Sequence, residues 1–343
     1  MKALILKDYN HFEFEEVPEP VIAPDEVIIR VKACGICGSD VHGMDGSTGR
    51  RIPPLIMGHE AAGIITDVGS RVKNYSKGDR VTFDSTIYCG ECHFCSEGFI
   101  NLCDNRRVLG VSCDEYVRNG AFAEYVAVPY RVLYHLPETI TFEQASMVEP
   151  LSIAFHALKR TQVVSGDTAV VVGTGIIGMF IIQLLRSHDC GCIIAVDTDR
   201  NRLNKACELG ADECISPDEK NVIEEIFNLT GGRGADRAFE VVGITQTIEI
   251  AAGGLKKGGT IILIGNFSPG VNLPLQKVVS RQLSLLGSCA SCGEYPACLD
   301  MIARGIVSVD PMISVTAPLS EGAQWFRRLY DREPGLLKVI LIP

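Results

Sequence analysis

The sequence predicts an α/β protein in which a barrel-like β domain is followed by a doubly wound parallel sheet of six strands. Short β-like runs punctuated by glycine fill the chain up to about residue 135, whereas strands alternate with helices from about residue 150 onward. The length of 343 residues also exceeds the usual size of a single hydrophobic core. We therefore expect a first domain over residues 1–150, a second over 151–288, and a tail over 289–343 that returns to the first.

Composition and charge limit the possible partners. The chain is 46% hydrophobic and 22% charged, as soluble globular proteins are, and its net charge is −10. An acidic chain with no basic tract argues against nucleic acid or an anionic membrane as the main partner. The first apolar run is too short for a signal peptide, and no run approaches the ~20 apolar residues of a membrane span. We expect a cytoplasmic protein.

Breakers and apolar runs mark the strands of the first domain. Residues 26–33 form an apolar run after three prolines, and residues 63–69 and 78–83 are further runs that begin with glycine. These short, evenly spaced segments are typical of a twisted barrel.

A cysteine-rich lobe over residues 89–103 interrupts this domain. Two successive two-residue gaps allow three thiolates to converge on one ion, and a fourth closes the tetrahedron after a seven-residue loop; the residues are Cys89, Cys92, Cys95 and Cys103. Four thiolates with no open position predict a structural zinc site. The alternative, a zinc ribbon that binds nucleic acid, lacks basic and aromatic surroundings. Of the 14 cysteines, these four and Cys37, discussed below, have a proposed role, and we expect the other nine to be small buried residues rather than a disulfide framework.

A glycine motif joins a strand to a helix at the start of the second domain. The apolar run 168–172 leads directly into Gly173, Gly175 and Gly178, and an apolar helix follows. A second strand over 193–196 ends at Asp197, about twenty residues after the glycines. This context predicts a dinucleotide-binding turn whose acid binds the adenosine ribose and selects NAD over NADP. The alternative is a glycine turn that only packs a helix against the sheet of another α/β domain.

The alternation continues to the end of the second domain. We expect helices over 200–209, 221–229 and 245–255, and strands over 213–215, 237–242, 260–264 and 283–287, which complete six parallel strands. The tail has an expected helix over 296–304 and an apolar strand over 338–342.

A second candidate metal site is spread over three segments. A thiolate from Cys37, an imidazole from His59 and carboxylates from Glu60 and Glu149 would form a mixed-ligand zinc site. Mixed ligands with room for water or substrate are typical of catalytic zinc. For any one of these residues alone, a small buried cysteine or an ordinary loop pair is the simpler interpretation.

Together these motifs resemble the zinc-dependent medium-chain alcohol dehydrogenases, and among them the polyol (sorbitol dehydrogenase-like) branch. The resemblance covers essentially the whole chain and rests on Gly35–Asp40, Gly58–Glu60, the four-cysteine lobe, Glu149–Ser152 and Gly173–Gly178. It implies a GroES-like β domain with a Rossmann domain, two zinc ions per chain, NAD as cofactor, and a homodimer or homotetramer. The implied reaction is oxidation of a secondary alcohol to a ketone.

The resemblance also implies roles for individual residues. Ser39 resembles the hydroxyl that relays the substrate proton and His42 its exit to solvent; the alternatives are a helix cap and a surface histidine. Asp40 would orient His59. Glu149 either binds zinc directly or holds a zinc-bound water. The cofactor would contact the residues Ile176, Ile177, Asp197, Arg202, Ile264, Gly265 and Asn266.

Two positions depart from sorbitol dehydrogenases. Ala290-Ser291 stands in place of an arginine–tyrosine pair near the substrate, and Gly43 in place of an aromatic residue. The substrate therefore stays open: L-threonine or sugar-phosphate oxidation is the alternative within the family. A zinc-free enone reductase would lack Cys37, His59 and Glu60, and a binding protein without turnover is the alternative outside enzymes.

Overall fold

The chain folds into two compact units. The computed structural model describes residues 1–343 and divides them into unit 1, Met1–Ser152 with Ser291–Pro343, and unit 2, Ile153–Ala290. Every helix is too short, or insufficiently apolar, to span a bilayer.

Unit 1 is built on a seven-stranded sheet. Its main path runs in the order β12-β6-β5-β3-β20-β19, and β11 pairs with β3 beside this path. Its strands are β3 (Glu26–Gly35), β5 (Glu60–Val68), β6 (Arg80–Phe83), β11 (Tyr125–Pro129), β12 (Leu133–His135), β19 (Ile313–Pro318) and β20 (Lys338–Ile342). Smaller sheets contain β1 (Lys2–Asp8), β2 (His11–Glu16), β4 (Leu55–Ile56), β7 (Thr86–Ile87), β8 (Arg107–Val108), β9 (Val111–Ser112) and β10 (Val117–Arg118).

The long strand β3 lies at the centre of this sheet, and all of its residues are buried except Arg30 and Lys32. Its pairing with β5 shifts register twice, between Ile28 and Ile29 and between Val31 and Ala33. Such bulges increase local twist and curve a sheet. The curved sheet encloses the core of unit 1, in which Phe122 and Phe326 meet edge to face.

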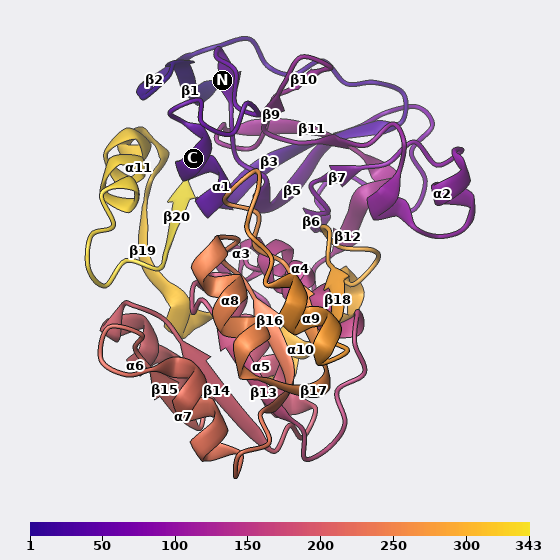
Figure 1. Cartoon of the computed structure of the whole chain (residues 1–343). Helices are drawn as coiled ribbons and strands as arrows, with labels where there is room; N and C mark the ends of the chain where they lie inside the picture. The colour runs from indigo at the N-terminus through magenta and orange to yellow at the C-terminus, as the bar shows by residue number, and fades with distance from the viewer. The chain divides into compact units, whose positions relative to one another are not determined.

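The C-terminal segment is part of unit 1. Strand β20 pairs antiparallel with β3, with Leu341 opposite Cys34 and Ile340 opposite Gly35 (Figure 1). The last strand of the chain therefore lies beside the end of β3 that leads to Cys37.

Helices of unit 1 are short and lie at its connections. They are α1 (Gly38–Gly43), α2 (His93–Ser96), α3 (Phe142–Ser146), α10 (Tyr295–Ala303) and α11 (Gly322–Tyr330), and α4 (Val148–Lys159) begins in unit 1 and ends in unit 2. Helix α3 starts with a capping box in which Thr141 and Gln144 satisfy each other's backbone N–H groups.

Unit 2 contains the predicted six-stranded parallel sheet, which confirms the expected fold class. The strand order is β15-β14-β13-β16-β17-β18. The strands are β13 (Thr168–Val172), β14 (Cys192–Val196), β15 (Glu213–Ile215), β16 (Ala235–Glu240), β17 (Leu255–Leu263) and β18 (Ser284–Gly287). The order reverses at β13, where the chain returns to start the second half of the sheet on the other side.

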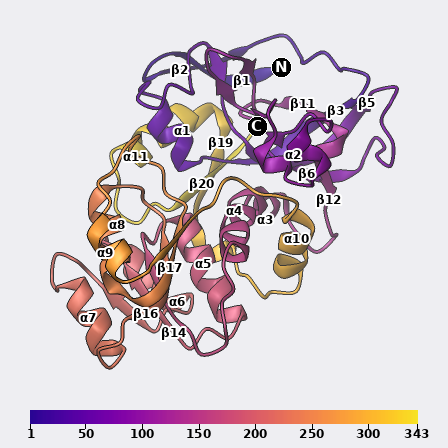
Figure 2. The same ribbon diagram turned by 45° about the vertical axis from the view of Figure 1, so that its right-hand side comes forward.

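Helices cover both faces of this sheet. They are α5 (Ile176–Ser187), α6 (Arg200–Glu208), α7 (Val222–Leu229), α8 (Thr245–Gly254) and α9 (Leu275–Ser280). Helices α7, α8 and α9 lie together on one side (Figure 2), where Ile226 and Ala251 join the core with Val170 and Ile194. Strand β13 is buried at all five positions, as expected for a strand that is covered on both faces.

The expectation that the remaining nine cysteines are buried is confirmed at three positions only, and Cys113, Cys192 and Cys292 are half-buried. Cys207 and Cys214 form a disulfide between α6 and β15, and Cys289 is an exposed free thiol. Cys34, Cys190 and Cys298 are buried, as expected. A seven-residue separation carries no sequence signal of pairing, because the contact depends on how α6 packs against the sheet edge.

Candidate active site and metal centres

Cys37, His59 and Glu60 converge in unit 1, as the sequence predicted. One possible ligand atom from each lies within 4.8 Å of the others. Cys37 follows β3 as the N-cap residue of α1, and Glu60 opens the neighbouring strand β5. The turn before them requires Gly58, whose φ is 95° and whose Cβ would lie 2.8 Å from the backbone nitrogen of Phe122.

Asp40 lies behind His59. Its Oδ2 is 3.3 Å from His59 Nδ1, and both side chains are buried. Burial alone would lower the pKa of His59, but the charges of Asp40 and Cys37 raise it well above its usual value. Burial likewise opposes ionisation of Asp40, yet the charges of His59 and Arg51 hold its pKa at about 2. The group therefore favours positive charge at the imidazole.

Lys338 is a member of this site that the sequence analysis missed. Its Nζ lies 2.5 Å from Glu60 Oε2 and 3.0 Å from the carbonyl oxygen of Ile36. Both side chains are almost completely buried. Lys338 opens β20, so only the pairing of β20 with β3 brings it to Glu60, 278 residues away in the chain.

Glu149 lies close to the same group. It is in the first turn of α4, and its Oε1 accepts a hydrogen bond from Ser85 Oγ at 3.3 Å. Burial raises the pKa of Glu149 to about 7, and among the charges acting on it are those of His59 and Glu60. The structure therefore places Glu149 beside the Cys37–His59–Glu60 group.

A buried carboxyl, also missed by the sequence analysis, adjoins Glu149. Asp84 Oδ2 accepts a hydrogen bond from Ser291 Oγ at 2.9 Å, and its Oδ1 accepts one from the backbone N–H of Thr86 at 2.8 Å. Burial raises the pKa of Asp84 to about 6. Ser291, noted above as a departure from sorbitol dehydrogenases, is thus a partner of Asp84.

The two residues suggested for proton transfer lie on α1. Ser39 is exposed and its Oγ donates a hydrogen bond to Cys37 Sγ at 3.3 Å. It does not cap the helix, because the N-cap residue is Cys37 and no side chain caps it. His42 is half-buried in the last turn, and burial lowers its pKa.

The donor set of this site fits a zinc ion. Glu60 Oε1 is buried without a hydrogen-bond partner, which is costly unless the atom has another partner. Sulfur, imidazole nitrogen and carboxylate oxygen are all zinc ligands. The sulfur and nitrogen donors favour zinc over magnesium or calcium, which prefer oxygen.

The four cysteines of the lobe also converge. One sulfur from each lies within 4.8 Å of the others, and Cys103 Sγ accepts a hydrogen bond from the backbone N–H of Cys89 at 3.2 Å. Backbone N–H groups of Glu91 and Cys92 lower the pKa of Cys89 to about 6, whereas burial raises that of Cys95 to about 12. A bound cation would stabilise all four thiolates together, so this donor set also fits zinc.

The glycine motif of unit 2 has the geometry that a dinucleotide requires. Gly173 has a φ of 99°, and a Cβ on Gly178 would overlap the carbonyl oxygen of Gly173. A Cβ on Gly175 would have nothing within 4 Å. Helix α5 begins at Ile176 and continues through Ile177, with Gly175 as its N-cap residue. The turn is therefore tight on its inner side and open where a pyrophosphate could approach the helix N-terminus.

Asp197 faces this motif. Its Oδ2 accepts hydrogen bonds from the backbone N–H of Thr174 at 2.7 Å and from Thr174 Oγ1 at 3.0 Å. Its Oδ1 accepts one from the backbone N–H of Asp199 at 2.9 Å. Arg202, in the first turn of α6, has a buried Nε 3.7 Å from Asp199 Oδ2.

The segment after β17 completes the predicted cofactor residues. Ile264, Gly265 and Asn266 follow this strand, and the backbone N–H groups of Ile264 and Gly265 both donate to the carbonyl oxygen of Glu240. The segment thus lies at the edge formed by the carboxyl ends of the parallel strands, as does the Gly173–Gly178 turn after β13.

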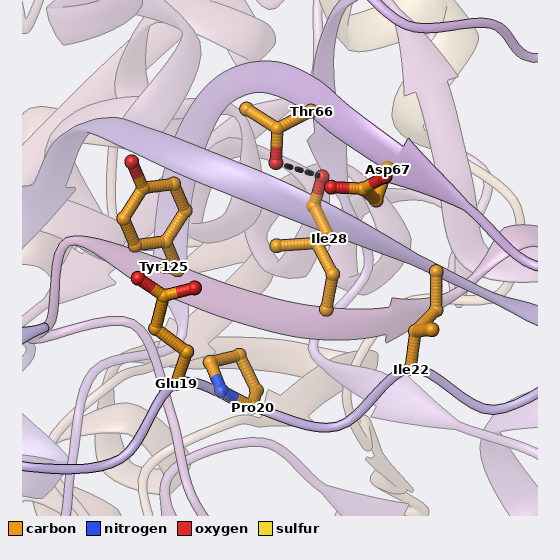
Figure 3. Close-up of a pocket in the computed structure, with 7 residues that line it drawn as sticks. All are labelled: Glu19, Pro20, Ile22, Ile28, Thr66, Asp67 and Tyr125. Atoms are coloured by element: carbon orange, nitrogen blue, oxygen red, sulfur yellow. Dashed lines mark hydrogen bonds between the residues drawn. The ribbon is translucent and has the colours of Figure 1, made fainter.

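A surface pocket of about 290 Å³ lies elsewhere on unit 1 (Figure 3). It is lined by Glu19, Pro20, Ile22, Ile28, Thr66, Asp67 and Tyr125. It contains neither candidate metal group, and Thr66 Oγ1 bonds to the carbonyl oxygen of Ile28 within it. We assign it no part in the chemistry.

The fold and these two donor sets define a zinc-dependent dehydrogenase with a nicotinamide cofactor. The model of the alcohol dehydrogenase GroES-like domain matches residues 23–138, and that of the zinc-binding dehydrogenase domain matches residues 177–304. The chain belongs to the zinc-dependent medium-chain dehydrogenase family, and it is an oxidoreductase.

Several relatives span nearly the whole chain. Sorbitol dehydrogenase of Bacillus subtilis is 31% identical, with 100% of this chain and 97% of that protein aligned. D-arabitol-phosphate dehydrogenase of Enterococcus avium is 30% identical over 94% of this chain and 92% of its own. Among solved structures, a zinc-binding dehydrogenase from Sinorhizobium meliloti 1021 bound to NADP has a TM-score of 0.90 and 30% identity, and the match covers 100% of this chain and 99% of that one.

Proposed function

We propose that this enzyme oxidises a secondary alcohol of a polyol or sugar-derived substrate to a ketone, with NAD as the hydride acceptor. The observation that carries the proposal is the Cys37–His59–Glu60 group, in which His59 and Glu60 are buried, with the exposed Ser39 hydroxyl donating to Cys37 Sγ. This arrangement combines a metal site with a hydroxyl that reaches solvent. The relationship to sorbitol dehydrogenase supports a polyol as substrate.

Each residue of unit 1 has a separate task in this proposal. Cys37, His59 and Glu60 hold zinc, and Glu149 either completes the set or holds a water on the metal. Zinc, when bound, supplies Lewis acidity that lowers the pKa of a bound hydroxyl. Ser39 would relay the substrate proton: its Oγ would accept that proton while its own hydroxyl proton moves on toward His42, which would pass it to solvent. The low pKa of His42 keeps the ring neutral and able to accept that proton.

The cofactor assignment rests on residues of unit 2. NAD would be the hydride acceptor. Its pyrophosphate would bind at the N-terminus of α5, against the backbone of Ile176 and Ile177. Asp197 would accept hydrogen bonds from the adenosine ribose and repel the 2′-phosphate of NADP. Arg202 would lie near the adenosine, and Ile264–Asn266 near the nicotinamide. NADP in the Sinorhizobium meliloti relative makes this preference a point to test.

We propose two zinc ions per chain with different roles. The Cys89–Cys92–Cys95–Cys103 lobe presents four sulfurs and leaves no position for substrate, which suits a structural ion. The mixed site has three protein ligands and can leave a position open.

The test is NADH formation across a substrate panel of sorbitol, xylitol and other polyols, polyol phosphates, L-threonine and simple secondary alcohols. We expect turnover with one or more polyols, with kcat/KM at least tenfold above that for L-threonine. Preferred turnover of a polyol phosphate would favour the alternative that the D-arabitol-phosphate relative suggests. No turnover with any member, although NAD binds, would contradict the proposed substrate class.

A further inference from the structure

Arg51 is a buried cation beside the candidate catalytic zinc site. The residue is 4% exposed, whereas the side chain of its neighbour Arg50 is exposed to solvent. It lies on the segment between α1 and β4, where an isolated bridge pairs it with Ser112. Burying a guanidinium costs free energy unless other groups compensate for the lost water, so the contacts of Arg51 indicate its role.

Its main partner is Asp40. Arg51 Nε and Nη2 both donate to Asp40 Oδ1, at 2.9 and 2.7 Å. The other oxygen of the same carboxylate, Oδ2, lies 3.3 Å from His59 Nδ1. Asp40 is therefore held from one side by Arg51 and faces His59 with the other. This contact fixes the orientation of the carboxylate that in turn orients the imidazole.

The guanidinium also reaches Ser39. Arg51 Nη2 lies 3.4 Å from Ser39 Oγ, whose hydroxyl donates to Cys37 Sγ at 3.3 Å. The remaining nitrogen, Nη1, donates to the carbonyl oxygen of Arg50 at 2.9 Å. The Arg51 side chain thus contacts both Asp40, which faces His59, and Ser39, which donates to Cys37.

Gly43 makes room for this arrangement. A Cβ at position 43 would lie 2.5 Å from Arg51 Cγ and 3.1 Å from Thr48 Oγ1. Gly43 is buried, so any larger side chain would displace the arginine. The buried position of Arg51 therefore depends on the absence of a side chain at Gly43.

We propose that Arg51 is a positioning residue of the metal site: it fixes Asp40, and through it His59, and it holds the Ser39 hydroxyl against Cys37. The inference rests on the proposed function, in which His59 and Cys37 bind zinc and Ser39 transfers a proton. It concerns the affinity and geometry of that zinc, which can be measured without any substrate.

The first experiment measures zinc affinity by chelator competition in Arg51→Gln, with Arg50→Gln as the matched control. Outer-shell partners of metal ligands typically contribute 10–100-fold to metal affinity. We expect Arg51→Gln to weaken one of the two zinc ions by about that factor, and Arg50→Gln to leave both unchanged. Equal zinc affinity in the two variants would overturn the proposal.

A double-mutant cycle tests whether Arg51 acts through Asp40. We expect Asp40→Asn combined with Arg51→Gln to lose little more zinc affinity than Asp40→Asn alone, because the two residues form one unit. Fully additive losses would overturn the route through Asp40. Arg51→Lys keeps the charge without the two-nitrogen contact, so it should restore part of the affinity and serve if Arg51→Gln does not fold.

A spectroscopic readout separates positioning from general stability. With cobalt(II) in place of zinc, the visible absorption reports the ligand geometry around the metal. We expect Arg51→Gln to shift this spectrum and to lower kcat about tenfold while the affinity for NAD stays constant. An unchanged spectrum with a lowered melting temperature would overturn the positioning role. Absence of turnover in the wild-type enzyme would count against the proposed function alone, since the zinc and cobalt readouts would still test Arg51.

Discussion

Lys338, five residues before the last residue of the described chain, places its Nζ 2.5 Å from Glu60 Oε2 at the start of β5. Both side chains are buried, so each charge has lost its hydration and is stabilised by the opposite charge instead. Burial alone would lower the pKa of Lys338, but the charge of Glu60 raises it. The contact links the last strand of unit 1 to the candidate metal site.

Removing this lysine should strongly destabilise unit 1. We expect Lys338→Met to lower the free energy of unfolding by about 3–5 kcal/mol, because Glu60 keeps a buried charge without its partner. Lys77→Met is the control, since the Lys77–Asp67 pair has the same 2.5 Å separation but is exposed, and it should cost under about 1 kcal/mol. Urea unfolding with chelator present measures both. Similar losses in the two variants would contradict the account of the buried pair.

The lobe should bind zinc independently of the mixed site. Cys103→Ser should lower zinc from two ions per chain to one and lower the melting temperature, because the fourth thiolate of the lobe is lost. NADH formation should persist at low temperature. Cys113→Ser, which replaces a half-buried free thiol outside both metal groups, is the control. Unchanged zinc content in Cys103→Ser would remove the structural-site proposal.

Asp197 should determine the choice between NAD and NADP. Asp197→Ala removes the carboxylate that accepts from Thr174 and Asp199, and it should weaken NAD binding by about 10–100-fold, the range for a hydrogen bond to a charged group. NADP binding should change less or improve, because the repulsion of its 2′-phosphate is lost. Titration of both cofactors measures the ratio. A ratio equal to that of the wild-type protein would contradict the assignment.

Asp84 should make stability depend on pH. Burial raises the pKa of Asp84 to about 6 from an ordinary value of 3.8, so the folded protein keeps this proton while the unfolded chain has lost it. Stability from this group therefore falls as pH rises from about 4 to about 6, by up to ~3 kcal/mol. The asparagine of Asp84→Asn does not titrate. As pH rises across this window, the melting temperature of the wild-type protein should therefore fall relative to that of the variant. A difference that does not vary with pH would contradict this prediction.

Much of this molecule could be predicted from the sequence because its signals are local. The glycine motif of unit 2 lies between an apolar strand and an apolar helix, so its place in the parallel sheet follows from adjacent residues. The lobe cysteines are close in the chain, and their spacing alone predicts convergence. His59 and Glu60 are neighbours, and Gly58 before them indicates the turn they need.

The residues that were missed depend on packing between distant segments. Lys338 reaches Glu60 only because β20 pairs with β3, and Ser291 reaches Asp84 across 207 residues. Arg50 and Arg51 are adjacent arginines, so the sequence does not distinguish the buried one from the exposed one. The small residue Gly43 is the one local signal that space is left for a buried side chain. A charged residue in an apolar terminal strand, such as Lys338 before residues 339–342, is the signal that could have been used.

The most direct test of the central claim is the comparison of zinc content and NADH formation in Cys37→Ser and in the wild-type enzyme. The account predicts two zinc ions per chain and turnover for the wild-type protein, and one zinc ion with no measurable turnover for the folded variant. Zinc added back to chelator-treated wild-type enzyme should restore activity. Two zinc ions in Cys37→Ser, or turnover that survives both the substitution and the chelator, would contradict a catalytic zinc held by Cys37, His59 and Glu60.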